Sequence, residues 1–300
     1  MTAKGITERG VPAWAQALPL AGVFALFFVV PLVLTVMVSL WNYNAYEIVP
    51  DITARNYWEA FEGCANRLLS ATPELCTTLK TYLTTLRICL TVWLITLALG
   101  FTIAYFLAFH VRSLTVQIVL FLICTIPFWT SNVIRMISWI PLLGRNGLVN
   151  QALVTTGLAS EPVEWLLFSD FAVIVAFVHL YTLFMIVPIF NSMMRIDRAL
   201  LEAAYDAGAS GWQTLSNVVI PLAKPGIVIG SIFVLTIVMG DFVTVGVMGG
   251  QQIASVGKMI NTQMGNLQFP PAAAHAVVLL ASVLVLIWGL TRLVDIRKEL

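Results

Sequence analysis

The segment "EAAYDAGASGWQTLSNVVIP", residues 202–221, is a short polar stretch inside a strongly apolar chain. Its first residues, Glu202 and the two alanines that follow, favour a helix. We therefore predict a short helix at about residues 200–216. Two prolines, Pro221 and Pro225, are expected to turn the chain after this helix. The segment raises the question of what a polar helix does between two long apolar runs.

The composition assigns the chain to the membrane. Of its 300 residues, 59% are hydrophobic and 10% are charged, whereas a soluble domain has about 25% charged residues. The mean hydropathy is +0.92. The net charge of +1 does not indicate a nucleic-acid partner, and the three histidines form no pattern of metal ligands. We therefore predict an all-α integral membrane protein that binds neither nucleic acid nor metal.

Apolar stretches long enough to cross the bilayer recur along the chain. Crossing needs about 20 residues, and the six predicted spans are 17–41, 82–109, 114–142, 171–194, 226–248 and 272–292. The first stretch is too long for a removable signal peptide and lacks its small-residue cleavage site, so we expect it to be retained. Residues 1–300 are then expected to form one membrane domain.

The distribution of Lys and Arg orients these spans. If the N-terminus is cytoplasmic, the cytoplasmic segments hold nine of these residues and the outer loops hold five. An even number of spans then places both termini in the cytoplasm. Segment 202–221 falls in the cytoplasmic loop between the fourth and fifth spans.

A short amphipathic helix at the cytoplasmic surface has two interpretations. It can lie among the lipid head groups, or it can dock onto a soluble partner. The carboxylates of Glu202 and Asp206 favour the soluble partner over an anionic lipid surface.

The spacing within this segment resembles the EAA signature of ABC importer permeases. The matching positions are Glu202, Ala203, Ala204, Gly208, Ile220 and Pro221, with Asp206 in the same helix. Ile220 stands where that family usually has Leu. The resemblance implies the type I importer fold with six transmembrane helices. It also implies that the segment is the coupling helix, which fits a cleft on a separate ATPase subunit.

The chain has no phosphate-binding loop of the G-x-x-x-x-G-K-[ST] type. The Gly257–Lys258 pair lacks both the first glycine and the hydroxyl residue of that motif. We therefore expect no enzyme activity and no cofactor on this chain. The resemblance implies that ATP and Mg²⁺ are bound by the partner ATPase.

Segments 127–150 and 240–250 are similar to the spermidine/putrescine branch of these permeases. This resemblance implies a multi-pass permease of the bacterial inner membrane that imports a polyamine. Its expected partners are a second related permease, two copies of an ATPase subunit and a periplasmic substrate-binding protein. Because the subfamily includes importers of other solutes, an opine, a betaine-like compound or an amino-acid derivative stays an alternative.

Polar and charged residues within the spans are candidates for a substrate path. On a helix, Asn132, Arg135 and Trp139 share one face, and Asp241 lies in or near the end of the fifth span. Charges inside a bilayer are costly and usually face a cavity or a partner. Asp241 therefore meets a cationic solute, with Trp129 or Trp139 contributing a ring face, or forms a structural pair with Arg135. A third alternative is that Asp241 or Arg135 lies at the membrane interface rather than at its midplane.

Cys64 and Cys76 lie in the long loop after the first span. The predicted topology places this loop in an oxidising compartment, where disulfides persist. Eleven residues separate the two cysteines, so a disulfide between them is permitted.

Two other classes of protein fit the sequence less well. A secondary transporter or channel also has a few buried charges, but it gives no reason for segment 202–221. A membrane-embedded enzyme would need clustered histidines or carboxylates at membrane depth, and the sequence has no such cluster.

Overall fold

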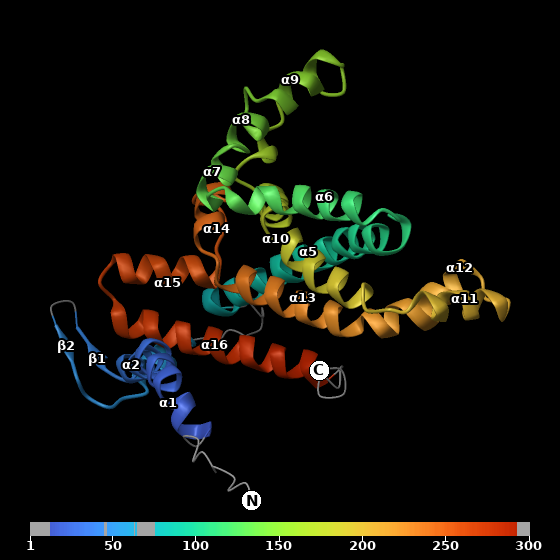
Figure 1. Cartoon of the computed structure of the whole chain (residues 1–300). Coiled ribbons are helices and arrows are strands. Elements are labelled where there is room, and N and C mark those ends of the chain that lie inside the picture. The colour runs from blue at the N-terminus through green and yellow to red at the C-terminus, as the bar shows by residue number, and fades with distance from the viewer. Residues whose placement is uncertain (1–12, 45–46, 63, 65–75, 293–300) are drawn as a thin grey trace, which may run out of the picture.

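The computed structural model describes residues 13–44, 47–62, 64 and 76–292, and this part of the chain is mostly helical (Figure 1). Within the described residues, five helices are long and apolar enough to cross a membrane: Ala15–Ser39, Thr77–His110, Glu164–Met193, Gly211–Gly240 and Phe269–Arg292. They contain, in order, α1 (Ala13–Phe24) with α2 (Val30–Ser39), then α5 (Thr77–Tyr105), α10 (Asp170–Met193), α13 (Ile220–Gly240) and α16 (Phe269–Arg292). These helices correspond to five of the six predicted spans.

The predicted third span, 114–142, is not one straight helix. It begins as α6 (Leu114–Thr125), continues as the 3-10 turn Ile126–Trp129 and then bends by 91°. Pro127 lies in that turn, and because proline has no backbone N–H, the α-helical hydrogen-bond ladder is interrupted there. If the bent pair is counted as one span, the structure has up to six.

Beyond the bend, the chain forms three short helices, of which the first packs against α10 and the other two project away from the long helices (Figure 1). They are α7 (Asn132–Ile137), α8 (Ile140–Leu143) and α9 (Leu148–Thr155). The chain then returns to the body through the 3-10 turn Glu164–Leu166 and enters α10.

The predicted fifth span, 226–248, is shifted along the chain. The continuous helix runs from Gly211 to Gly240 and consists of α12 (Gly211–Thr214), a π-helical turn (Leu215–Val219) and α13. The expectation that Pro221 and Pro225 turn the chain is wrong, because both lie inside this helix. Pro221 has no backbone N–H to donate within the helix. The π-helical turn directly before it changes the hydrogen-bond register of the helix at this point.

The core is formed where α10 packs between α5 and α13. Two glycines allow this close approach. A Cβ atom added to Gly226 of α13 would lie 2.3 Å from the Pro188 carbonyl oxygen of α10. A Cβ atom added to Gly100 of α5 would lie 2.8 Å from Cγ of Met185. Small residues at such contacts let helix backbones approach closely in a membrane.

The two ends of the bundle differ. At one end, β1 (Asn42–Tyr43) pairs antiparallel with β2 (Ile48–Val49), and α15 (Val256–Gly265) lies at the same end (Figure 1). The short helix α3 (Arg55–Ala60) contacts α16. At the opposite end, α11 (Arg198–Asp206) and α12 project from the body (Figure 1). Segment 202–221 and the predicted outer loops therefore lie at opposite ends of the long helices.

Candidate functional site

The polar segment folds as two helical pieces that meet at a glycine. α11 ends after Asp206, and Gly208 has a φ of +84°. The Gly208 N–H donates to the Tyr205 carbonyl at 2.8 Å, and the Ala209 N–H donates to the Ala204 carbonyl at 3.0 Å. These bonds form a Schellman motif, which uses a residue with positive φ. The predicted single helix at 200–216 is therefore wrong, because the chain reverses its backbone conformation at Gly208.

A second helix begins immediately after this turn. Ser210 caps it by accepting from the Gln213 N–H at 3.4 Å, and the Gln213 side chain accepts from the Ser210 N–H at 2.8 Å. This reciprocal capping box satisfies backbone donors at the helix start. Both pieces of the segment thus have defined ends and form an ordered projection.

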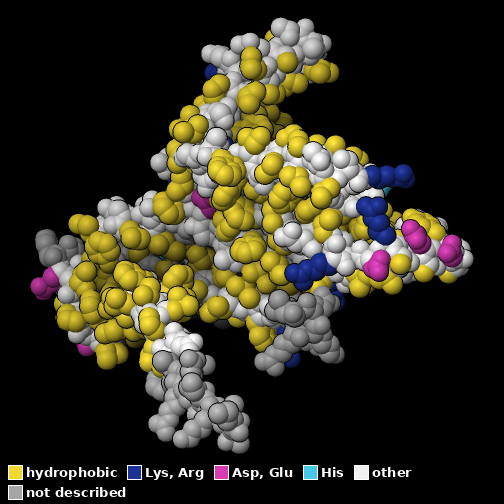
Figure 2. Space-filling model, in the orientation of Figure 1, with side chains coloured by type: hydrophobic (Ala, Val, Ile, Leu, Met, Phe, Trp, Pro, Cys, Tyr) yellow, Lys and Arg dark blue, Asp and Glu magenta, His cyan; other side chains and the backbone are white. Residues whose placement is uncertain are grey.

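The first half of the EAA signature lies on the exposed surface of this projection. Glu202, Ala203, Asp206 and Gly208 are exposed, and Ala204 is half-buried. Figure 2 shows acidic side chains gathered on the projecting end, with Lys and Arg side chains on the adjacent ends of the long helices. Ile220 and Pro221, the second half of the signature, belong to the long helix and are also exposed.

Apolar side chains accompany the acids on the same projection. The Tyr205 side chain is 54% exposed and the Trp212 side chain is 73% exposed. Aromatic residues are enriched at protein-binding surfaces, and the carboxylates add negative charge to this one. This arrangement can accept a soluble partner that is basic and partly apolar.

Asp241 lies at the break between α13 and α14 (Val243–Met248). Its Oδ1 atom accepts from the Thr244 N–H at 2.9 Å, and its Oδ2 atom accepts from the Thr244 hydroxyl at 2.7 Å. Tyr181 of α10 also donates its hydroxyl hydrogen to Oδ2. The carboxylate therefore holds the start of α14 and joins it to α10.

A cavity of about 350 Å³ lies beside this carboxylate, and we call it the outer cavity. Its polar lining comes from Asn132, Tyr181, Asp241 and Thr244, and Met136 and Ile237 are among its apolar lining residues. Two of the predicted path residues, Asn132 and Asp241, thus lie at one cavity. The cavity can bind a small group that carries positive charge or hydrogen-bond donors.

Arg135 is buried and does not pair with Asp241. Its guanidinium donates from Nη2 to Asn132 Oδ1, and among the described residues its Nε atom has no hydrogen-bond partner. The three ion pairs that join described residues do not include these two side chains. The direct structural pair between Arg135 and Asp241 is therefore not formed in this structure.

The two predicted tryptophans do not line the outer cavity. Trp129 is 83% exposed at the end of the 3-10 turn. Trp139 lies beyond the end of α7, and its indole N–H donates to His179 Nδ1 at 3.0 Å. The shared helical face predicted for residues 132–139 therefore extends only to Asn132 and Arg135, because α7 ends at Ile137.

Tyr181 and Thr244 are site residues that the sequence analysis missed. Tyr181 lies in a mostly apolar predicted span, where a tyrosine is an ordinary residue, so its position did not mark it as a site residue. Thr244 follows Asp241 by three residues, and an aspartate that precedes a helix often accepts from the backbone N–H two or three residues on. That pattern could have indicated a new helix after Gly240.

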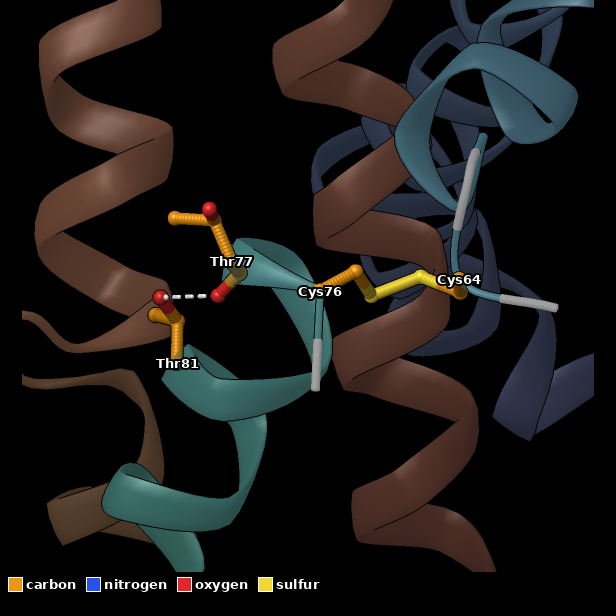
Figure 3. Close-up of a disulfide and its surroundings, with 4 residues drawn as sticks. All are labelled: Cys64, Cys76, Thr77 and Thr81. Carbon is orange, nitrogen blue, oxygen red and sulfur yellow. Dashed lines mark hydrogen bonds between the residues drawn. A yellow bond between two sulfur atoms is a disulfide. The ribbon is translucent and has the colours of Figure 1, made fainter. Parts of the chain in front are cut away.

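The structure joins Cys64 and Cys76 in a disulfide, with their Cα atoms 4.9 Å apart (Figure 3). Cys76 directly precedes α5, and the next turn of that helix contains the Thr81 hydroxyl, which donates to the Thr77 carbonyl at 2.9 Å (Figure 3). The bond therefore ties the loop after the first span to the start of the second.

The same loop is tied to the end of the first span. The Asn56 side-chain amide donates to the carbonyls of Ser39 and Trp41, at 2.8 Å in each case. The Tyr57 hydroxyl lies 2.6 Å from Ser39 Oγ.

No group of three or more potential metal ligands occurs within the described residues.

Comparison with known proteins identifies the family. Residues 96–298 match the model of the "Binding-protein-dependent transport system inner membrane component" family. The chain is 34% identical over 208 residues to the spermidine/putrescine transport system permease protein PotB of Escherichia coli K12, a match that covers 68% of this chain and 74% of PotB. It is 28% identical over 244 residues to the inner membrane ABC transporter permease protein YdcU of the same organism, covering 74% and 77% of the two chains.

Solved structures show the same fold. A bacterial ABC transporter involved in the import of the acidic polysaccharide alginate gives a TM-score of 0.69 at 19% identity, covering 93% of both chains. A bacterial alginate ABC transporter in complex with an alginate pentasaccharide-bound periplasmic protein gives a TM-score of 0.67 at 18% identity. This match covers 92% of this chain and 91% of that chain. The chain therefore belongs to the family of binding-protein-dependent transport system inner membrane components, as an ABC importer permease.

Proposed function

We propose that this chain is one permease subunit of an ATP-driven importer that carries a polyamine, such as spermidine or putrescine, into the cytoplasm by alternating access. The observation that carries the proposal is the 34% identity to the spermidine/putrescine permease PotB over 74% of that relative. The outer cavity supports it, because the cavity offers the Asp241 carboxylate to a cationic solute.

The same proposal includes three kinds of partner. Two copies of an ATPase subunit bind ATP and Mg²⁺, and one of them receives the projection formed by α11 and α12. A second, related permease completes the path, and a periplasmic binding protein delivers the solute. The exposed Glu202, Asp206 and Trp212 support the ATPase contact, since they give this projection both charge and apolar area.

Asp241 is proposed to meet the cationic part of the solute. Its carboxylate already accepts three hydrogen bonds from Tyr181 and Thr244, and a carboxylate has about four acceptor positions. One acceptor position and the negative charge thus remain for an ammonium group.

A second candidate solute is a cation that also bears a carboxylate, such as an opine or a betaine-like compound. The buried Arg135 favours this candidate, because its Nε atom has no partner among the described residues. Arg135 lines a separate cavity of about 190 Å³ that also contains His179, rather than the outer cavity. Polyamine stays the first proposal, because Arg135 and Asp241 do not line the same cavity.

Purification and transport together test the proposal. The tagged permease is expressed with the proposed partners, an ATPase, a second permease and a binding protein from the same source, and the proposal expects all four to assemble. The complex is then placed in lipid vesicles with ATP, and uptake of labelled putrescine and spermidine is measured. Omission of ATP is the control and should abolish uptake.

Competition separates the two candidate solutes. Unlabelled spermidine should suppress the uptake of labelled putrescine, while glycine betaine and octopine should not. Uptake of betaine or octopine without uptake of either polyamine would favour the second candidate. An assembled complex that hydrolyses ATP but imports none of these compounds would contradict both.

A further inference from the structure

Three cavities lie in series along one face of α10 and α13. The outer cavity reaches Tyr181 on α10 and Asp241 at the end of α13. A middle cavity of about 220 Å³ is lined by Phe184 and Pro188 of α10 and by Phe233 of α13. An inner cavity of about 560 Å³ shares Pro188 with the middle one and continues to the cytoplasmic end of both helices.

The lining residues recur at helical spacing. On α10 they are Tyr181, Phe184, Pro188 and Asn191, followed by Arg195 just after the helix, and on α13 they are Ile237, Phe233, Ile229 and Pro225. Residues three or four positions apart share one face of a helix. The three cavities therefore follow a single groove between the two helices.

The polarity of the groove changes along its length. The outer cavity contains Asp241 and Asn132, and the inner cavity contains Asn191, Arg195 and Asp197. The middle cavity is lined by Phe128, Leu183, Phe184, Val187, Pro188 and Phe233, all of which are apolar. Water and ions are thus disfavoured between the two polar ends.

Aromatic rings surround this apolar middle section. The Phe184 ring lies 5.6 Å from the Phe128 ring in an edge-on arrangement and 6.3 Å from the Phe233 ring. The Tyr181 ring, whose hydroxyl contacts Asp241, lies 6.1 Å from the Phe184 ring. An organic cation that leaves the carboxylate would therefore next meet ring faces, which attract cations.

We propose that Phe184 and Phe233 form the constriction of the cation path, closing it to leakage and selecting the cation through their ring faces. This inference rests on the proposed function in one respect: the second permease proposed there would cover the side of the groove that α10 and α13 leave open. A cation moves from Asp241, past the two rings, to the inner cavity.

The first test separates the ring from its volume. Phe184→Leu and Phe233→Leu keep an apolar side chain of similar size but remove the ring face. In vesicles that hold the complete complex, uptake of labelled putrescine should fall roughly 2- to 30-fold, the range that a cation–π contact supports. Phe184→Tyr keeps the ring and should retain uptake.

The matched control lies on the same helix. Phe190 of α10 stacks on Phe121 with ring centroids 5.0 Å apart and lines none of the three cavities. Phe190→Leu should leave uptake unchanged. Equal uptake by wild type and both leucine variants at the constriction would overturn the selective role of the rings.

The second test measures closure without using the transported solute. Vesicles are loaded with labelled tetramethylammonium, and its release is followed in the absence of ATP. The double variant Phe184→Ala, Phe233→Ala should release the cation, while wild type and Phe190→Ala should retain it. Retention by an assembled double variant would overturn the constriction.

The two tests also distinguish this inference from the proposed function. If the wild-type complex imports no polyamine, the proposed function fails, and the release of tetramethylammonium still tests the constriction. If wild type imports polyamine and the variants behave like it, the constriction fails while the proposed function stands. If the double variant does not assemble, the leucine variants decide.

Discussion

Tyr181 of α10 and Asp241 at the end of α13 are 60 residues apart in sequence and are joined by a hydrogen bond from the hydroxyl to the carboxylate. The contact links a long helix to the point where another long helix breaks. A carboxylate with three protein donors is held in place, and its remaining charge faces the outer cavity. Asp241 is therefore both the acceptor that fixes the first turn of α14 through Thr244 and the proposed contact for the cation.

Asp241→Asn should slow uptake and preserve assembly. The Thr244 N–H donates to Asp241 Oδ1 at 2.9 Å, and the side-chain carbonyl of Asn can still accept this bond. The negative charge is lost. Because Arg135 is not paired with Asp241 in this structure, the change strands no guanidinium. Vesicle uptake of putrescine and the yield of assembled complex are the two measurements.

Uptake and the yield of assembled complex together decide whether Asp241 serves the cation path or a structural pair with Arg135. Unchanged uptake by Asp241→Asn would remove the residue from the path. Loss of assembly that is rescued by Arg135→Gln in the same chain would show that the pair is structural. Tyr181→Phe serves as the companion variant, since it removes only a hydrogen bond, which in membrane proteins contributes about 0.6 kcal/mol on average.

Gly208→Val should uncouple ATP hydrolysis from transport. A φ of +84° is unfavourable for a β-branched residue, and the left-handed conformation costs roughly 1–2 kcal/mol for a residue with a side chain. The α11 projection would therefore change shape. Stimulation of ATPase activity by the loaded binding protein is the measurement.

Gly208→Asn is the matched control, because Asn tolerates the left-handed conformation. A Cβ atom at this position meets nothing within 4 Å in the described structure, so the isolated permease has room for the side chain. Normal stimulation in Gly208→Asn and loss in Gly208→Val would assign the glycine to backbone conformation. Loss in both would instead indicate that the ATPase packs closely against this position.

Cys64 and Cys76 are expected to be bonded in the mature protein. The bond closes a loop with a sequence separation of 12, and a loop of that size contributes roughly 3 kcal/mol of stability in the chain-entropy model. Mass spectrometry of a non-reduced digest should find the linked peptides. The Cys64→Ser, Cys76→Ser double variant should unfold at a lower temperature than wild type, while Cys124→Ser, which changes a free thiol, should not.

Gly226→Ala should reduce the yield of folded protein. The added Cβ atom would lie 2.3 Å from the Pro188 carbonyl oxygen and 2.6 Å from Ser192 Oγ, so α10 and α13 would have to separate. Gly240→Ala on the same helix is the control, because its Cβ atom meets nothing within 4 Å in the described structure. Size-exclusion chromatography in detergent compares the two, and equal monodisperse yields would contradict the close contact.

Hydropathy predicted most of the spans because lipid exposure requires long apolar runs, and five of the six have a counterpart of crossing length. The residue spacing of segment 202–221 predicted the family, since Glu202, Gly208 and Pro221 stand at the spacing of the EAA signature that the segment resembles. The helix termination at Gly208 could also have been predicted, because glycine is the residue that ends helices with positive φ.

Proline was the main source of error in the fold. Pro221 and Pro225 resembled helix breakers but lie inside a helix that contains a π-helical turn, whereas Pro127 resembled a span residue but lies at a bend. Sequence does not distinguish these cases, because packing against neighbouring helices decides whether a proline is tolerated. Tyr181 was missed for a similar reason, since only the fold brings it to Asp241.

The bend after Trp129 has a consequence for the lipid around this protein. The third crossing consists of twelve α-helical residues followed by four in a 3-10 turn, which together reach about 26 Å. A typical hydrocarbon core is about 30 Å thick. If α6 and the 3-10 turn alone cross the bilayer, the bilayer thins on the α6 side, or Thr130 and Ser131 lie within the hydrocarbon. We therefore expect α6 to match the thin bilayer of vesicles made from lipids with short acyl chains better than a thick bilayer.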